Sequence, residues 1–260
     1  MTRAREIAEA VEEIAPGALA EDWDNPGLQV GNPGSEVNRV LVALTPLPEV
    51  FEEAEETGTN FLLFHHPLIF RSLNSVDLGS YPGGLIARAV KGGLAVYAAH
   101  TNYDAAPGGV SVALAETLGL AGPLSVVVPR GESGYPEGCG YGRVGRMAEP
   151  LPPEELRDHV SESLGFPARL VANPGPARRV ERVAVLGGSG GSFVREAAAS
   201  GAQAYVTGDL DYHDTLLAES LGLVAIDAGH AATELPSLEP LARRLAGLVD
   251  VPVSVSRVRR

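Results

Sequence analysis

The sequence predicts an α/β protein made of two similar halves with mainly parallel sheets. Short apolar runs rich in valine, leucine and isoleucine alternate with segments of helical periodicity, a pattern typical of βαβ units. The order strand, helix, strand, helix, strand, helix occurs twice, in residues 39–120 and 182–250. In both segments polar side chains gather at the ends of the second and third strands. The alternative fold is one continuous sheet in which the similar spacing is a coincidence.

The N-terminal half is expected to open with an amphipathic helix over residues 4–14, because apolar side chains recur on one face. The later elements alternate between buried strand and helix. We expect strands at 39–45, 61–64 and 93–99, and helices at 48–57, 85–90 and 108–118.

The C-terminal third is expected to repeat this alternation after a different middle segment. Its predicted strands are 183–188, 204–207, 223–227 and an edge strand at 251–256, and its predicted helices are 193–199, 215–220 and 235–248. The middle, residues 121–181, has valine-rich alternation broken by glycine and proline, which predicts antiparallel strands, and a helix with proline at its start over 152–165.

These elements predict three parts. Residues 1–125 form an N-terminal α/β half, residues 126–180 form a bridging segment with no inserted extra domain, and residues 181–260 form a C-terminal α/β half.

Composition excludes several classes of protein. The chain has 33 acidic and 20 basic residues, a net charge of −13, which makes nucleic acid an unlikely partner. Lys91 is the only lysine and precedes Gly92, so there is no G-K-[ST] phosphate loop. The single Cys139 excludes an intramolecular disulfide and a cysteine-rich metal site. The apolar runs are too short to span a membrane and the first segment is unlike a secretory signal, so we expect a soluble cytoplasmic protein.

His65 and His66 follow the strand at 61–64. Adjacent residues on a strand point to opposite faces, so both histidines can serve one site only where the chain turns past the strand end. Pro67 favours such a position because it restricts His66 to extended geometry. The alternative is one solvent-exposed histidine and one core histidine.

Two further pairs place a histidine four residues before a carboxylate. Asp104 follows His100 just after a strand and is the better ligand candidate of the two. His100 would then contact a ligand without binding the metal itself, or relay a proton. The alternative is an ordinary turn. His230 and Glu234 share one face if Gly229 begins a helical turn; a solvent-exposed helical pair is the alternative. A histidine and carboxylate set without cysteine suits Zn, Fe, Mn or Mg.

The motif TGDLDYHD adds Asp209, Asp211 and His213 near the end of another strand. They could supply a ligand, a base or a helix cap, and we favour a role behind the ligands or on the substrate side. In EDWDNPGLQVG, Trp23 is interpreted as a buried anchor or as a wall of the cleft.

The glycine-rich run GGSGGS leads from a strand into a helix. Its backbone N–H groups and the helix dipole could hold an anion or a phosphate, whereas a tight turn would need the glycines for steric reasons alone. The candidate substrate-binding residues are Gly187, Gly188, Ser189 and Gly190.

Six motifs in this order resemble the NIF3-like (NGG1-interacting factor 3-like) dinuclear metal-centre family, of which many bacterial members carry the name GTP cyclohydrolase 1 type 2 homologue. The motifs are EDWDNPGLQVG, LLFHHPLIF, AAHTNYDAAPGG, VLGGSGGSF, YVTGDLDYHD and VAIDAGHAATE, and the resemblance covers about residues 3–255. It implies two similar α/β domains with two divalent metal ions in a cleft between them, and a ring-shaped homohexamer. It implies the metal ligands His65, His66, Asp104, His230 and Glu234. Where family members usually have an aspartate, this chain has Thr45 or a neighbour.

These observations predict a metal-dependent hydrolase that acts on a small phosphorylated or nucleotide-like substrate. With so few ligands for two ions a carboxylate must bridge, and the candidates are Asp104 and Glu234. Ions bridged in this way share a water molecule and lower its pKa. His100 and His213 are candidate proton relays. The alternative is a ring protein that binds metal and a partner and catalyses nothing.

Overall fold

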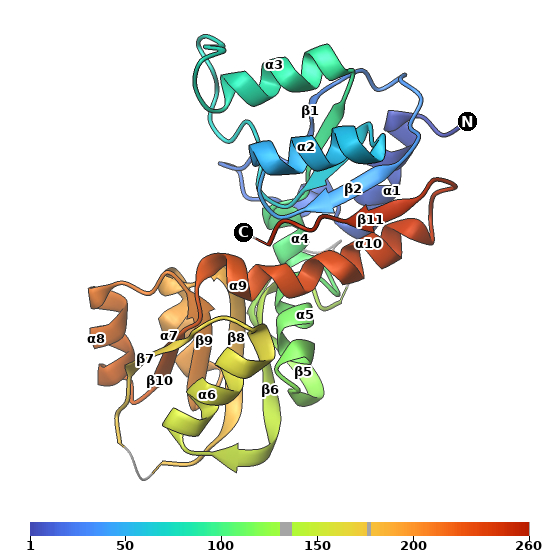
Figure 1. Ribbon diagram of the computed structural model, residues 1–260. Coiled ribbons are helices and arrows are strands. Elements are labelled where there is room, and N and C mark those ends of the chain that lie inside the picture. Colours follow the sequence, from blue (N-terminus) through green and yellow to red (C-terminus); the bar gives the residue numbers. More distant parts are fainter. Residues whose placement is uncertain (131–136, 176–177, 260) are drawn as a thin grey trace. The chain divides into compact units, whose positions relative to one another are not determined.

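The computed structural model describes residues 1–130, 137–175 and 178–259. The chain forms two compact units (Figure 1). The first unit comprises Met1–Ala106 and Leu238–Arg260, and the second comprises Pro107–Ser237. Two short parts of the predicted bridging segment, 131–136 and 176–177, lie outside the described residues.

The first unit contains a five-stranded sheet in the order β1-β4-β3-β2-β11. Neighbouring strands are parallel, except that β1 runs antiparallel to β4. The central strands are buried on both faces, as expected of apolar runs without alternation. The strands are β1 (Gly27–Val30), β2 (Val40–Ala43), β3 (Phe61–Phe64), β4 (Ala95–Ala98) and β11 (Val253–Val255).

Two pairs of helices pack in this unit, α2 with α3 and α1 with α10 (Figure 1). The core under α2 joins Phe51 to Phe64, whose rings stack with centroids 6.0 Å apart. The helices are α1 (Ala4–Ile14), α2 (Pro48–Thr57), α3 (Gly83–Gly92), α4 (Thr101–Ala105) and α10 (Leu238–Ala246), with a 3-10 turn at Gly17–Leu19.

The second unit contains a six-stranded sheet in the order β5-β6-β8-β9-β10-β7. Strands β8, β9 and β10 are parallel, while β5, β6 and β7 pair antiparallel with their neighbours. The strands are β5 (Ala121–Pro129), β6 (Gly140–Leu151), β7 (Arg169–Ala172), β8 (Val180–Ser189), β9 (Ala204–Gly208) and β10 (Val224–Asp227).

Helices α5 and α6 bury leucine and valine side chains against alternate residues of β8, including Val183 and Val185. Helices α7 and α8 contact each other. The helices of this unit are α5 (Val110–Thr117), α6 (Pro153–Leu164), α7 (Val194–Ala199), α8 (Tyr212–Ser220) and α9 (His230–Glu234), with 3-10 turns at Gly191–Phe193 and Leu235–Ser237.

The predicted α/β class is confirmed, and the described residues form two mixed sheets rather than one continuous sheet. The units divide the chain at other points than the expected parts do. Helix α10 and strand β11 return to the first unit, where Val253 lies opposite Val40 and β11 extends the parallel sheet at the edge of β2. The expected bridge supplies the end of β5, together with β6, β7 and α6, to the second unit, where the strands complete the sheet on both sides. Among the helices that the structure describes, none has the length and apolar character needed to cross a membrane.

Candidate metal centre

His65 and His66 lie directly past the end of β3, where the backbone still pairs with the end of β2. Their amide groups donate to the carbonyls of Ala43 and Leu44 at 3.1 and 2.8 Å. The His65 side chain is fully buried, and its Nδ1 lies 2.9 Å from the carbonyl oxygen of Ala99. Because a carbonyl only accepts, Nδ1 carries the proton and Nε2 of His65 presents its lone pair.

His100 lies past the end of the neighbouring strand β4 and caps α4. Its Nδ1 is 2.7 Å from Oδ1 of Asp24, whose side chain is fully buried. The other oxygen of Asp24 accepts hydrogen bonds from the amide and the hydroxyl of Thr101 at 3.0 and 2.5 Å. Burial raises the pKa of Asp24, but the hydrogen bonds from His100 and Thr101 outweigh it and hold the pKa at about 2. Asp24 is therefore ionised and fixes the ring of His100.

The three histidines of the first unit form one cluster. A ring nitrogen from each of His65, His66 and His100 lies within 4.8 Å of those of the others. Oδ1 of Asp104, on α4, lies 3.7 Å from Nε2 of His65. Ligand atoms that share one ion at about 2.0–2.2 Å are themselves about 3–3.5 Å apart, so this spacing is close to that of two ligands of one cation.

A histidine and a glutamate form the corresponding group in the second unit. Helix α9 begins at His230, and Nε2 of His230 lies 3.1 Å from Oε1 of the buried Glu234 one turn later. Nδ1 of His230 lies 2.7 Å from Oδ2 of Asp209. The hydrogen bond with Glu234 raises the pKa of His230 to about 9, with burial opposing this effect and Asp209 reinforcing it. In the absence of a cation, a proton on Nε2 therefore balances the carboxylate.

Glycines make room for this pair. A Cβ atom on Gly188 would lie 2.5 Å from Oε1 of Glu234, and a Cβ atom on Gly208 would lie 2.6 Å from the backbone nitrogen of His230. Gly188 and Gly229 also have positive φ angles of 74° and 85°. The glycines thus let β8 and β9 approach α9 within the second unit.

The donor set fits a divalent cation. In proteins, a metal-binding histidine usually hydrogen-bonds at one ring nitrogen to a carboxylate, carbonyl or other oxygen, which fixes the ring and directs the other nitrogen at the ion. All four histidines described above have Nδ1 within 3.0 Å of an oxygen. The histidine and oxygen pairs are His65 with Ala99, His66 with Thr45, His100 with Asp24, and His230 with Asp209.

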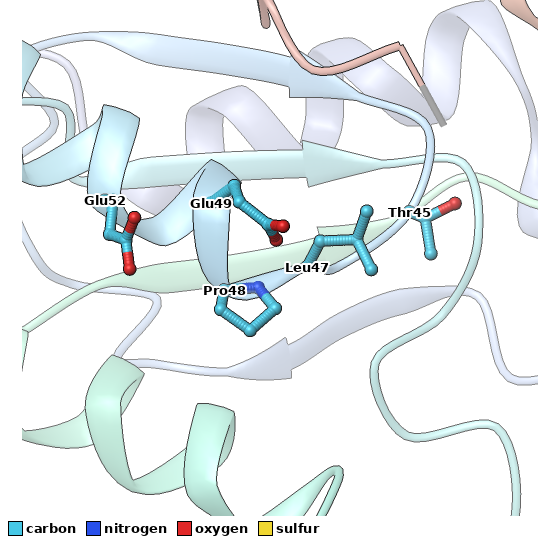
Figure 2. Close-up of a pocket in the computed structure, with 5 residues that line it drawn as sticks. All are labelled: Thr45, Leu47, Pro48, Glu49 and Glu52. Atoms are coloured by element: carbon cyan, nitrogen blue, oxygen red, sulfur yellow. The ribbon is translucent and has the colours of Figure 1, made fainter.

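Thr45 lies just past the end of β2, next to the histidine cluster. Its hydroxyl lies 3.0 Å from Nδ1 of His66 and so holds this ring. Thr45 also lines a pocket of about 610 Å³ with residues of the β2–α2 loop and α2, and Figure 2 shows Glu49 and Glu52 projecting from that helix. Two carboxylates make this pocket unfavourable for a phosphate group.

The glycine-rich run lies within β8 and the turn that follows. The amide of Gly188 donates to the Thr233 hydroxyl at 2.9 Å, and the amide of Gly190 donates to the carbonyl of Gly208 at 3.2 Å. These donors are used inside the protein, and close packing accounts for the glycines. The anion-binding role proposed for Gly187, Gly188, Ser189 and Gly190 stays a prediction.

The structure also places the remaining two histidines, His159 and His213, and the single tryptophan, Trp23. His213 is exposed on the first turn of α8 beside Tyr212, and its relay role stays a prediction. His159 is half-buried, with Nε2 2.9 Å from the Leu118 carbonyl oxygen. Trp23 is 60% exposed, so it is not the buried anchor that was one of its two interpretations.

Sequence reasoning missed the role of Asp24. Its motif contains several polar residues before a turn, and nothing in the spacing indicates a bond to a histidine 76 positions later. The favoured position of Asp209 behind the candidate ligands agrees with its bond to His230.

Comparisons with known proteins agree with one another. The family model described as Duf34/NIF3 (NGG1p interacting factor 3) matches residues 2–260. A protein of Streptomyces coelicolor named GTP cyclohydrolase 1 type 2 homolog is 38% identical over 253 residues, which cover 96% of this chain and 88% of the relative. One of the same name from Nostoc is 38% identical, covering 88% and 89% of the two chains. The crystal structure of a Bacillus cereus protein related to NIF3 is 27% identical and superposes with a TM-score of 0.90 over 99% of this chain and 97% of the other.

Proposed function

The chain belongs to the Duf34/NIF3 (NGG1p interacting factor 3) family, and from this premise we propose that it binds two divalent metal ions and hydrolyses a small phosphorylated or nucleotide-like substrate. The proposed ligands are His65, His66, Asp104, His230 and Glu234. Zn, Fe, Mn and Mg are the candidate metals.

One observation carries the metal part of this proposal. Each histidine of the two groups has its Nδ1 atom against an oxygen, which directs Nε2 away from that oxygen as in metal-binding histidines. Three of these histidines, His65, His66 and His230, are the proposed ligands, and the repeated arrangement supports a shared role for them.

The protein's own residues then have separate tasks. His65, His66 and His230 supply neutral imidazoles, and Asp104 and Glu234 supply the negative charge that balances divalent ions. When bound, two such ions lower the pKa of a water molecule and polarise a phosphoryl or amide-like oxygen. Nε2 of His100 accepts and returns the proton during hydrolysis, while Asp24 holds the ring in place through Nδ1.

The test is to measure metal content and hydrolysis together. We expect purified protein loaded with Zn, Mn or Fe to retain about two ions per chain and to hydrolyse at least one compound from a panel of nucleotides and phosphoesters. His65→Ala and Glu234→Ala should lose metal and activity. The matched controls are His159→Gln, a histidine on α6, and Glu219→Ala, an exposed glutamate on α8; both should keep metal and activity.

Two results would count against the proposal. Full activity of metal-free Glu234→Ala would refute a metal-dependent reaction. Retention of metal without turnover of any compound, together with metal-dependent capture of a partner protein, would favour the non-catalytic ring protein instead.

We also propose that the protein assembles into a homohexamer in the cytoplasm, as the family resemblance and the composition led us to expect. Light scattering coupled to size-exclusion chromatography should then give about six times the chain mass of 27.0 kDa. A monomer or a dimer at micromolar concentration would refute the hexamer.

A further inference from the structure

Two large aromatic side chains lie exposed beside the histidine cluster of the first unit. Trp23 is 60% exposed and Phe70 is 44% exposed, and their ring centroids are 5.9 Å apart in an edge-to-face arrangement. Both rings also meet the ring of His100 edge to face, at 6.3 and 6.1 Å. His100 in turn lies within the cluster that contains His65 and His66.

The segments that carry the two rings are fastened to each other. The Asn25 side-chain amide donates to the Ile69 carbonyl at 2.5 Å, and the Gln29 side chain accepts from the Ile69 amide at 2.9 Å. The Gln29 side chain also donates to the carbonyl of Asn25 at 2.7 Å. Each aromatic residue therefore has a hydrogen-bonded neighbour within two positions, so the rings are held while their surfaces stay in solvent.

Such an arrangement is unusual for structural aromatic residues. A tryptophan stabilises a fold by burying its large apolar surface, and Trp23 buries less than half of its own. Asp24 and Asn25, the two residues that follow it, use their polar groups to fix this turn against Thr101, His100 and Ile69. The turn is thus built to present Trp23 rather than to bury it.

We propose that Trp23 and Phe70, whose ring planes lie at 76° to each other, form a site for a planar heteroaromatic ring of the substrate, such as a nucleobase, which stacks on one ring and meets the other edge to face. This inference rests on the proposed function, because it places the ring of the substrate beside the histidines assigned to metal binding and proton transfer. Flat aromatic rings bind exposed tryptophan and phenylalanine faces by stacking, with little dependence on which base is present.

The chemistry around the rings decides the expected selectivity. The amide groups of Asn25 and Gln29 are engaged with Ile69, so they are not placed to read the edge of a base. We therefore expect the site to accept all four common nucleobases, and purines more tightly than pyrimidines because their larger rings stack over more area.

The chain offers a direct probe of this binding, because Trp23 is its only tryptophan. Intrinsic tryptophan fluorescence should fall as GMP, AMP, CMP or UMP is added to protein loaded with Mn²⁺. Ribose 5-phosphate, which has the sugar and the phosphate without the base, should cause little quenching. Absence of base-dependent quenching by all four nucleotides would overturn the proposal.

Variants measured by equilibrium dialysis complete the test. Trp23→Ala should weaken GMP binding about tenfold and leave ribose 5-phosphate binding unchanged, while Trp23→Phe should keep most of the affinity. Tyr212→Ala is the matched control, since Tyr212 is 72% exposed and also lies edge to face with a histidine, His213. This control should bind both compounds as the wild type does.

The design separates this inference from the proposed function. If Trp23→Ala loses the preference for GMP over ribose 5-phosphate but no metal or hydrolysis is found in any form, the stacking site stands and the proposed reaction fails. If metal and hydrolysis are present and Trp23→Ala binds GMP normally, the stacking site is wrong. A fall in assembly mass of Trp23→Ala with unchanged GMP binding would show that a second copy covers the rings, and would also overturn the site.

Discussion

At the scale of single residues, Asp24 shows how one carboxylate fixes the ring of a histidine. It is buried, it accepts from His100 and Thr101, and these bonds hold its pKa at about 2 despite burial. The ordinary pKa of 3.8 applies in the unfolded chain. A carboxylate whose pKa falls on folding stabilises the folded state above its unfolded pKa and loses that contribution as the pH falls towards its folded pKa.

Asp24→Asn should remove this pH dependence. We expect the wild type to lose about 2 kcal/mol of unfolding free energy between pH 4 and pH 2 that the variant does not lose. Urea unfolding at pH 6, 4, 3 and 2 measures the difference. Asp22→Asn, an exposed neighbour, should behave as the wild type does at every pH. Parallel curves for the wild type and Asp24→Asn would contradict the assigned role.

Gly188→Ala should weaken metal binding at Glu234, in addition to the loss of stability that backbone strain at position 188 causes. The new Cβ atom would lie 2.5 Å from Oε1 of Glu234, in addition to the strain of a φ angle of 74°. Gly201→Ala is the control, because φ is 79° there and the nearest atom is 3.9 Å away. We expect both to lose about 1 kcal/mol of stability from strain, and only Gly188→Ala to bind metal at least about tenfold more weakly. Equal metal affinities, measured by competition with a chromophoric chelator, would contradict this account.

The sequence predicted the positions of the candidate ligands better than it predicted their surroundings. His65 and His66 follow the end of an apolar strand, and Glu234 follows His230 by one helical turn. Such local spacing can be recognised from the sequence. The bonds from Asp24 to His100 and from Thr45 to His66 join residues far apart in the chain. No local pattern carries that information, because it depends on which loops the sheet brings together.

At the scale of elements, α2 is tied to the chain that follows β11. Glu53 is buried on α2 and accepts from the Ser256 hydroxyl at 2.6 Å and from the Arg257 amide at 3.1 Å. The nearby Glu56 is exposed and pairs with the Arg257 guanidinium at 2.9 Å. Both carboxylates bind the segment that follows β11, Glu53 from a buried position and Glu56 from an exposed one.

Glu53→Ala should destabilise the protein much more than Glu56→Ala. Removal of Glu53 leaves the buried Ser256 hydroxyl and the Arg257 amide without their acceptor, at a cost of about 2–3 kcal/mol. Loss of the exposed pair at Glu56 should cost less than about 1 kcal/mol. Thermal and urea unfolding of both variants measure the difference. Equal losses would show that the buried carboxylate does not fasten this segment.

The elements with strong apolar patterns were predicted well. Strands β2, β3 and β4 are buried apolar runs, which can be predicted without knowing which strands pair with them. Strands β1 and β7 have mostly half-buried side chains and pair antiparallel at sheet edges. Their strand conformation depends on a neighbour in the sheet, so the local sequence pattern predicts it poorly.

At the scale of the whole molecule, one unit is continuous in sequence and the other is not. Residues 107–237 form the second unit, whereas the first needs both Met1–Ala106 and Leu238–Arg260. The C-terminal part supplies β11 to the edge of β2 and α10 to the side of α1. Repeated strand–helix order in the sequence suggested two halves but could not show that the last two elements belong to the first.

A fragment of residues 107–237 should fold alone, and a fragment of residues 1–106 should not. The first fragment retains its whole sheet, while the second exposes the edge of β2 and the apolar side of α1. Circular dichroism and urea unfolding should show a cooperative transition only for the first fragment. Co-expression of residues 1–106 with 238–260 should restore a transition, and a cooperative transition of 1–106 alone would contradict this prediction.

The return of β11 to β2 also sets an order of events during protein synthesis. The ribosome makes the strands that carry His65 and His100 early, yet the sheet that contains them lacks its last strand until β11 has emerged. The second unit is complete before that moment. A messenger truncated near its end would therefore yield a chain with the Glu234 group intact and the histidine cluster unsupported, and we expect cellular proteases to remove it.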